Sequence, residues 1–218
     1  MKILILGASS NVGYLLYREL LGCDVGLALA TRDFSGLVLS DCTEKYNLTK
    51  SNLKFVLDSA KADVVINCVG YSSPIDCEDN PIISRKVNYE FVSNLVSLMK
   101  KSRARLIHFS SSHVFSGRLG VDLYSEISIP DSDSIYGKHK CMADEFIMLE
   151  LSNYIIFRLT ALFKTSEKFQ RNTLKDLLVN NLSNGIITRL VSNTTTNYLN
   201  PSDIAAIVFK VAFLDKSG

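Results

Sequence analysis

Tyr136 and Lys140 are the two residues of this sequence whose types and spacing best suit acid–base chemistry. Residues four apart lie on one face of a helix, so both side chains can reach the same ligand. A free tyrosine has a pKa of about 10, and a neighbouring ammonium, the positive ring of a bound cofactor and a dry site can together bring that pKa to about 7. We therefore expect Tyr136 to donate a proton and Lys140 to lower the pKa of the tyrosine.

Three serines, Ser110 to Ser112, precede this pair and follow the apolar run Arg105–Phe109. A hydroxyl here can bond a carbonyl oxygen while Tyr136 protonates it, so that hydride added to the carbon meets an oxygen already stabilised. A Tyr-x-x-x-Lys pattern alone is common by chance, with an exposed tyrosine and a solvated lysine as the structural alternative. The preceding serines favour a carbonyl-reducing site.

The string GASSNVG, from Gly7 to Gly13, follows an apolar run and opens a helical pattern, which is the setting of a dinucleotide-binding turn. Gly7 permits the tight turn, and Gly13 permits a close approach of helix to sheet. Ser10 replaces the middle glycine of that motif and either donates to a phosphate or crowds it. We expect a dinucleotide to bind at this turn, on Gly7, Ser9, Ser10, Asn11, Val12 and Gly13.

The end of the second apolar run distinguishes the two nicotinamide dinucleotides. An acidic residue there binds a ribose 2′-hydroxyl, whereas an arginine accommodates a 2′-phosphate. This sequence has Thr31 and Arg32 at that point. Because a guanidinium makes charge-assisted bonds to phosphate, we predict NADP(H) as the preferred cofactor and NAD(H) as the second choice. The alternative interpretation is a surface arginine beside Asp33.

These groups must be positioned by an alternation of short apolar runs with longer helical patterns. Runs that are apolar at nearly every position belong to parallel sheets covered on both faces. Right-handed crossovers then place ligands beyond the carboxyl ends of the strands. The sequence therefore predicts a doubly wound parallel α/β sheet of the Rossmann type. The predicted strands are Ile3–Leu6, Val25–Ala30, Asp63–Val69, Arg105–Phe109 and Tyr154–Leu159, and the predicted helices are Tyr14–Leu21, Ser84–Lys101 and Tyr136–Leu151.

Composition excludes several other classes. The 24 basic and 22 acidic residues leave a net charge of +2 and are dispersed, so a nucleic-acid partner is not expected. The five cysteines lie far apart without a Cys-x-x-Cys pair, which predicts a reducing, cytoplasmic location and neither disulfides nor a zinc site. His108 and His139 have no second ligand at metal spacing, so we predict no metal. No segment has the length of a membrane span.

The strand–helix alternation weakens after about residue 163. We expect residues 1–163 to form the NAD(P)-binding domain and residues 164–218 to form a small or incomplete substrate-side region. In the second part we predict a helix at Asn172–Leu182, a strand at Gly185–Val191 and a last helix at Ser202–Leu214.

Taken together, the glycine turn, the serines and the Tyr–Lys pair resemble the extended branch of the short-chain dehydrogenase/reductase superfamily. The strings KADVVINCVG, IHFSSSHVFSG and IYGKHKCMADEF are most similar to the dTDP-4-dehydrorhamnose reductase group. The resemblance implies that Ser111 is the hydroxyl donor, Tyr136 the acid and Lys140 its helper. It also gives Lys140 a bond to the nicotinamide ribose.

The same resemblance implies further contacts. It assigns the adenine side to Asp41 and Cys42, and the strand end under the cofactor ribose to Cys68, Val69 and Gly70. It matches Asn88 to a family asparagine, whose alternative is a polar residue on the solvent side of its helix. The loop Tyr71–Asn80 would border the substrate, with substrate contacts at Tyr71, Ser112, His113 and Arg158. Members of this group carry Asp and Tyr where this chain has Ser112 and His113.

Three functions remain open from the sequence. The first is NADPH-dependent reduction of a 4-keto nucleotide sugar, with Tyr136 as proton donor, by a cytoplasmic enzyme that is a candidate homodimer. The second is epimerisation of the same class of substrate with the same residues. The third is a non-catalytic NADP-binding regulatory role. About 55 residues after 163 are fewer than the resembled group spends on its sugar site, which suggests a truncated chain, a minimal member or a reduced sugar pocket.

Overall fold

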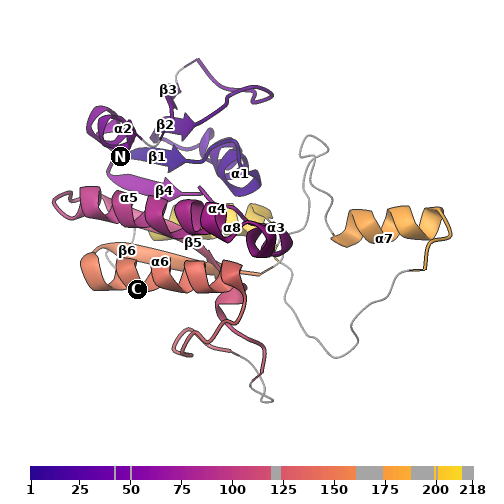
Figure 1. Ribbon diagram of the computed structural model, residues 1–218. Helices are drawn as coiled ribbons and strands as arrows, with labels where there is room; N and C mark the ends of the chain where they lie inside the picture. The colour runs from indigo at the N-terminus through magenta and orange to yellow at the C-terminus, as the bar shows by residue number, and fades with distance from the viewer. Residues whose placement is uncertain are drawn as a thin grey trace.

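The computed structural model of the 218-residue chain describes residues 1–41, 43–49, 51–118, 124–160, 174–187, 199 and 201–212. Its centre is a parallel six-stranded sheet of order β3-β2-β1-β4-β5-β6 (Figure 1). Neighbours β1 and β4 mark the point where the strand order reverses, so the sheet is doubly wound as predicted. The strands are β1 (Lys2–Leu6), β2 (Gly26–Thr31), β3 (Glu44–Asn47), β4 (Val64–Asn67), β5 (Arg105–Ser111) and β6 (Tyr154–Leu159).

Helices cover both faces of this sheet (Figure 1). A π-helical turn, η1, joins two of them into one continuous helical stretch, and a 3₁₀ turn, η2, follows β5. Helix α7 lies apart from the layered body in Figure 1. The helical elements are α1 (Asn11–Leu20), α2 (Leu53–Ala60), α3 (Pro74–Asp79), α4 (Pro81–Arg85), η1 (Lys86–Glu90), α5 (Phe91–Met99), η2 (Ser112–Val114), α6 (Ile135–Glu150), α7 (Leu174–Ser183) and α8 (Pro201–Ala212).

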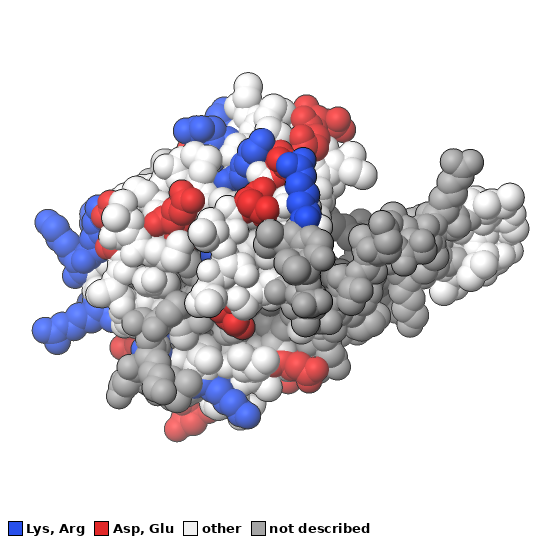
Figure 2. Space-filling view, turned by 90° about the horizontal axis from the view of Figure 1, so that it is seen from below, with Lys and Arg blue, Asp and Glu red and all other residues white. Residues whose placement is uncertain are grey.

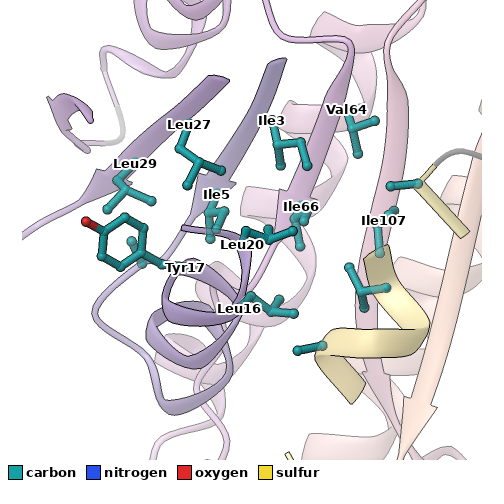
Figure 3. Close-up of a cluster of buried hydrophobic side chains, with 14 of the residues drawn as sticks. Ile3, Ile5, Leu16, Tyr17, Leu20, Leu27, Leu29, Val64, Ile66 and Ile107 are labelled. Carbon is teal, nitrogen blue, oxygen red and sulfur yellow. The ribbon is translucent and has the colours of Figure 1, made fainter. Parts of the chain in front are cut away.

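Two apolar clusters form because successive side chains of a strand point to opposite faces. Ile3 and Ile5 of β1 pack against α1 and α8 on one face, as the close-up in Figure 3 shows. Leu4 and Leu6 pack against α2, α5 and α6 on the other. All four side chains are fully buried, and each contributes about 1.5–3 kcal/mol relative to an exposed side chain. Burial on both faces explains why β1 is apolar at every position from Ile3 to Leu6.

Most of the predicted elements are present with shifted ends. Strand β3 and helix α2 were not predicted; β3 is an edge strand of polar, largely exposed residues. The expectation of a loop at Tyr71–Asn80 was wrong for residues 74–79, which form α3; the Ser73 hydroxyl caps this helix by accepting from the Asp76 N–H. Within the predicted strand Gly185–Val191, residues 185–187 are not in a strand and 188–191 lie outside the described residues.

Basic and acidic side chains are interspersed on the face seen in Figure 2, without a large patch of one charge. In the part of the chain that the structure describes, no helix is both long and apolar enough to cross a bilayer.

Candidate active site

The carboxyl ends of four neighbouring strands bring together most of the residues that the sequence singled out. Leu6 of β1 is paired with Asn67 of β4, and Asn67 with His108 of β5. Gly7, Thr31, Cys68 and Ser111 therefore lie along one edge of the sheet, at the ends of β1, β2, β4 and β5. This edge is where doubly wound sheets bind ligands.

Gly7 and Gly13 are required by close contacts as well as by turn geometry. Gly7 has φ +77°, and a Cβ there would lie 2.8 Å from the carbonyl carbon of Cys68 and from the nitrogen of Val69. A Cβ on Gly13 would lie 2.5 Å from the Gly7 oxygen. The turn therefore presents bare backbone against the end of β4, which leaves the N-terminus of α1 open to an anion.

Ser10 has a structural role that its place in the motif did not indicate. It is the N-cap of α1, and its Oγ accepts a hydrogen bond from the Gly13 N–H at 3.0 Å. Ser9 is exposed at the edge, with its hydroxyl 2.6 Å from that of Thr31. Asn11 is exposed and Val12 half-buried in the first turn of the helix. Ser10 thus replaces a glycine without closing the turn, because its side chain folds back onto the helix.

Arg32 follows β2 and is exposed. Asp33, the acidic neighbour that the alternative interpretation invoked, is held instead by the Ser35 backbone N–H at 2.8 Å and the Ser35 hydroxyl. Among the described residues, no acidic side chain forms an ion pair with Arg32. Asp41 is also exposed, and Cys42 lies outside the described residues.

The segment after β4 lies close enough to Lys140 for the lysine charge to act on Cys68. Cys68 and Val69 are half-buried and Gly70 is exposed. Loss of solvation raises the pKa of the Cys68 thiol, and the nearby Lys140 charge opposes that rise. Cys68 is therefore a neutral thiol here rather than a nucleophile.

Helix α6 carries a polar stripe on its buried face: Tyr136, Lys140 and Asp144, at four-residue intervals. Its start is fixed from two sides. The Ser134 hydroxyl accepts from the Gly137 N–H at 3.0 Å, and Glu78 of α3 accepts from the Ile135 N–H at 2.7 Å. Both contacts satisfy backbone donors that a helix N-terminus leaves unpaired.

The Tyr136 side chain is buried, with the residue only 8% exposed. Burial raises the pKa of its phenol above the usual 10.0, and hydrogen bonding with Ser111 opposes the rise. The pKa is raised in the protein without a dinucleotide because the cost of burying a phenolate outweighs the charges around it. The expected lowering includes the positive ring of a bound cofactor and stays a prediction. Tyr136 is held as a neutral phenol, the form that donates a proton. The His113 ring lies edge-on to it, with centroids 5.6 Å apart.

The three serines after β5 point to different partners. Ser111 interacts with Tyr136, and its Oγ also accepts from the His113 N–H at 3.2 Å. Ser110 instead donates to Asp144 Oδ2 at 2.9 Å. Ser112 begins η2 and is half-buried. Of the three, Ser111 is the one that the structure brings together with the tyrosine.

Lys140 lies in a buried polar environment rather than in solvent. Its Nζ donates to the Phe109 carbonyl oxygen at 2.6 Å and lies 3.3 Å from His108 Nε2. Burial lowers its pKa from 10.5 to about 8, a shift that Asp144 and Cys68 oppose. A large share of Lys140 is therefore the neutral amine at mildly alkaline pH.

Arg158, a predicted substrate contact, is engaged by Asp144. Its Nε lies 3.2 Å from Asp144 Oδ2, and its guanidinium lies over the Phe115 ring at 5.5 Å. The Asp144 side chain is fully buried, its Oδ1 has no hydrogen-bond partner among the described residues, and burial raises the pKa of its carboxyl. The pair anchors β6 to α6 and leaves little of the Arg158 side chain exposed.

Asn88 is buried, so its alternative assignment to the solvent side of the helix is wrong. It lies in the π-helical turn, and its amide bonds both the N–H and the carbonyl of Tyr71, at 2.9 and 3.0 Å. Such turns occur often at functional sites. Asn88 thus fixes the backbone of Tyr71, a predicted substrate contact.

Sequence reasoning missed three residues that build this site. Gly137 lies against the serine-bearing segment, because a Cβ there would be 2.0 Å from the His113 oxygen. Asn67 and His108 are fully buried in β4 and β5, beside Lys140. Polar side chains inside otherwise apolar strands were the available signal for the last two. Within the described ranges, no cluster of three or more His, Cys, Asp or Glu could hold a metal ion.

The strand order and the glycine turn are those of a Rossmann-type, NAD(P)-binding α/β fold, with Ser111, Tyr136 and Lys140 buried at the same edge of the sheet. Comparison with known proteins identifies the family. The model described as the RmlD substrate binding domain matches residues 1–213, and the chain belongs to that family.

The curated relatives include reductases and an enzyme subunit. The sequence is 28% identical over 178 residues to a dTDP-4-dehydrorhamnose reductase of Burkholderia thailandensis, covering 80% of this chain and 55% of the relative. It is 26% identical over 180 residues to the methionine adenosyltransferase 2 subunit beta of Xenopus laevis, covering 79% and 50%. The chain thus spans about half the length of the curated relatives that it matches.

Solved structures share the fold. The dTDP-4-dehydrorhamnose reductase of Bacillus anthracis, in complex with NADP, aligns with a TM-score of 0.80 at 18% identity, over 100% of this chain and 72% of that one.

Proposed function

We propose that this chain is an NADP(H)-dependent reductase that converts the 4-keto group of a nucleotide sugar to a hydroxyl. The observation that carries the proposal is the buried group Ser111, Tyr136 and Lys140 beside a glycine turn at the carboxyl edge of the sheet. The B. thailandensis relative is a reductase of a sugar of this class. Because this chain covers only part of that relative, its reaction must be tested directly.

The residues present fit a dinucleotide. The Gly7 position is a cradle that a single Cβ would fill, and Ser9 and Asn11 are exposed at the start of α1. Backbone N–H groups and the helix dipole there favour a pyrophosphate. Arg32, exposed and without an acidic partner in the described ranges, favours a 2′-phosphate. When bound, NADPH would supply the hydride.

The chain's own residues would supply the proton and the oxygen contacts. Tyr136, a neutral phenol whose pKa is raised by burial, donates its proton to the carbonyl oxygen as charge develops there. The Ser111 hydroxyl donates a second hydrogen bond to that oxygen. Lys140 lies one helical turn further along the same face and is placed to bind the nicotinamide ribose. The tyrosine then regains a proton from solvent before the next turnover.

We assign the sugar to the surface formed by the loop after β4 and by η2. Tyr71, with its backbone fixed by Asn88, lies on the first of these, and Ser112 and His113 lie on the second. The His113 ring contacts the Tyr136 ring, so a sugar against His113 would also be near the proton donor. Arg158, paired with Asp144, contributes through the position of β6.

The test is to mix the protein with NADPH and a panel of 4-keto nucleotide sugars and to follow the absorbance of the reduced nicotinamide. We expect oxidation with at least one sugar and its loss in Tyr136→Phe. Absence of turnover with every sugar, with identical traces for the variant, would refute the proposal. Product analysis separates reduction from epimerisation, since an epimerase changes the sugar without net loss of NADPH.

A regulatory function is the second candidate, because the Xenopus laevis relative is a subunit of methionine adenosyltransferase 2. In that case the chain would bind the dinucleotide without turnover. NADPH binding by calorimetry, combined with inactivity on the sugar panel, would favour this role over the enzymatic one.

A further inference from the structure

Two buried polar side chains, His108 and Asn67, extend one after the other from Lys140 into the sheet, and the proposed proton donation gives them no role. Asn67 is the last residue of β4, and His108 is its register partner on β5. Both are fully buried, each between apolar neighbours of its own strand, Ile66 in β4 and Ile107 and Phe109 in β5. Placing two such side chains in the core is costly unless their hydrogen bonds are made.

The orientation of the Asn67 amide follows from its neighbours. Its Oδ1 accepts a hydrogen bond from the Val69 backbone N–H at 3.1 Å, and its Nδ2 lies 3.0 Å from His108 Nδ1. Rotating the amide by half a turn would place its NH₂ group against the Val69 N–H, two donors facing each other. Asn67 Nδ2 is therefore the donor and His108 Nδ1 the acceptor.

The tautomer of His108 follows in turn. A neutral imidazole has one N–H, and with Nδ1 accepting, the proton resides on Nε2. Full burial favours the neutral ring, and the pKa of His108 is well below its usual value. The Nε2–H group lies 3.3 Å from Lys140 Nζ. The histidine thus presents a donor to the lysine.

Lys140 can satisfy this arrangement in only one protonation state. As an ammonium it has three donors and no acceptor, so His108 Nε2–H would face another donor. As a neutral amine it accepts from His108 while it still donates to the Phe109 oxygen at 2.6 Å.

We propose that Asn67 and His108 are positioning residues that act through Lys140: they fix a His108 Nε2–H donor and so favour the neutral amine of Lys140. This inference rests on the proposed function for its role in turnover. In its neutral form Lys140 brings no positive charge to the site where the proposed function places the nicotinamide ribose.

Other titratable groups face Lys140 and define the balance. Asp144, one turn later on α6, favours the ammonium, but its Oδ2 already bonds Ser110 and Arg158. The Cys68 thiol, from the segment after β4, also acts on Lys140. His108 opposes both from β5, and its removal should therefore move the titration of Lys140 to higher pH.

The first test needs neither cofactor nor turnover. The chain has three histidines, so nitrogen-15 labelling of histidine gives a spectrum with few signals, in which His108 is assigned by its loss in His108→Gln. We expect His108 to keep its proton on Nε2 and its ring signals to titrate with a midpoint near 8, the pKa of Lys140. That titration should vanish in Lys140→Met. A proton on Nδ1, or no titration, overturns the proposal.

The second test compares two buried histidines. His139, next to Lys140 in sequence, bonds Ser84 through Nδ1 at 2.8 Å and provides the control. In His108→Gln the amide oxygen can accept a hydrogen bond from the Lys140 ammonium. The apparent pKa of Lys140, measured from the pH dependence of NADPH binding and turnover, should therefore increase by about one unit. His139→Gln should not move it, and equal shifts in both variants overturn the proposal.

Asn67→Ala provides a further variant if His108→Gln does not fold. Without the Asn67 donor, His108 should populate the Nδ1–H tautomer in the nitrogen-15 spectrum, and an unchanged tautomer contradicts the proposal. If the sugar panel shows no activity, the labelled spectra still decide the state of His108. If turnover is present and the tautomer differs, the inference fails and the reductase proposal stands.

Discussion

At the β1 end of the carboxyl edge the functional surface is bare backbone, whereas at the β5 end it is a set of buried polar side chains. The glycine turn requires residues without a side chain, since a Cβ at Gly7 or Gly13 would lie within 3 Å of backbone atoms. The β5 end depends on the hydrogen bonds and protonation states of Tyr136, Lys140 and their neighbours. Substitutions at the first end should therefore act through shape, and those at the second through proton affinity.

The largest effect should come from Tyr136→Phe. Removing the phenolic hydroxyl takes away the proton donor but keeps the ring against His113, so turnover should fall by about 10²–10⁴-fold. Binding of NADPH, measured by calorimetry, should change little. A parallel loss of NADPH affinity would contradict the assignment of cofactor binding to the β1 end and of proton donation to the β5 end.

Gly7→Ala should be next in size and should act on binding. The added methyl group would clash with backbone of Cys68 and Val69, and the positive φ adds strain of about 1–3 kcal/mol. We expect at least a tenfold loss of NADPH affinity together with lower thermal stability. Gly36→Ala is the matched control, because Gly36 has φ +74° with nothing within 4 Å of its Cβ position. It should lose stability without losing NADPH affinity, and a similar affinity loss there would contradict the role of close contact.

Lys140→Met tests whether the lowered pKa of Lys140 makes the free energy of unfolding depend on pH. The pKa of Lys140 is about 8 in the folded protein against 10.5 as its ordinary value, so between these values the unfolded chain binds more protons. Stability of the wild-type protein should then rise with pH across this window, by about 2 kcal/mol between pH 8 and 10 from this group. Urea unfolding at several pH values should show that rise missing in Lys140→Met. The exposed Lys138→Met should retain it.

Arg32→Ala should have the smallest effect. Its guanidinium is exposed, so its contribution to a 2′-phosphate is screened, and we expect about a tenfold loss of the preference for NADPH over NADH. Titrating both dinucleotides into the variant and into Arg103→Ala, an exposed arginine elsewhere, measures this. An unaltered preference would remove Arg32 from the cofactor site.

The sequence predicted the apolar strands and the order of the chemical groups because both leave local patterns. Ile3–Leu6 is apolar at every position, and Tyr136 and Lys140 have helical spacing. The pKa of Tyr136 was not predictable in the same way, since it depends on how deeply the phenol is buried. The Asn67–His108 pair joins two strands across 41 residues, and only the register of β4 on β5 brings it together.

Helix α8 has a consequence for how the protein acquires its structure during synthesis. Ile204, Ala205 and Val208 lie in the same apolar cluster as Ile3 and Ile5, and Arg105 Nη1 donates to the Val211 oxygen at 2.8 Å. A nascent chain that has emerged only as far as β6 therefore leaves that face of the sheet without one of its two helices. Contacts between such distant segments slow folding, and exposed apolar surface favours aggregation. The face that contains Ile3 and Ile5 therefore stays partly uncovered until α8 has been synthesised.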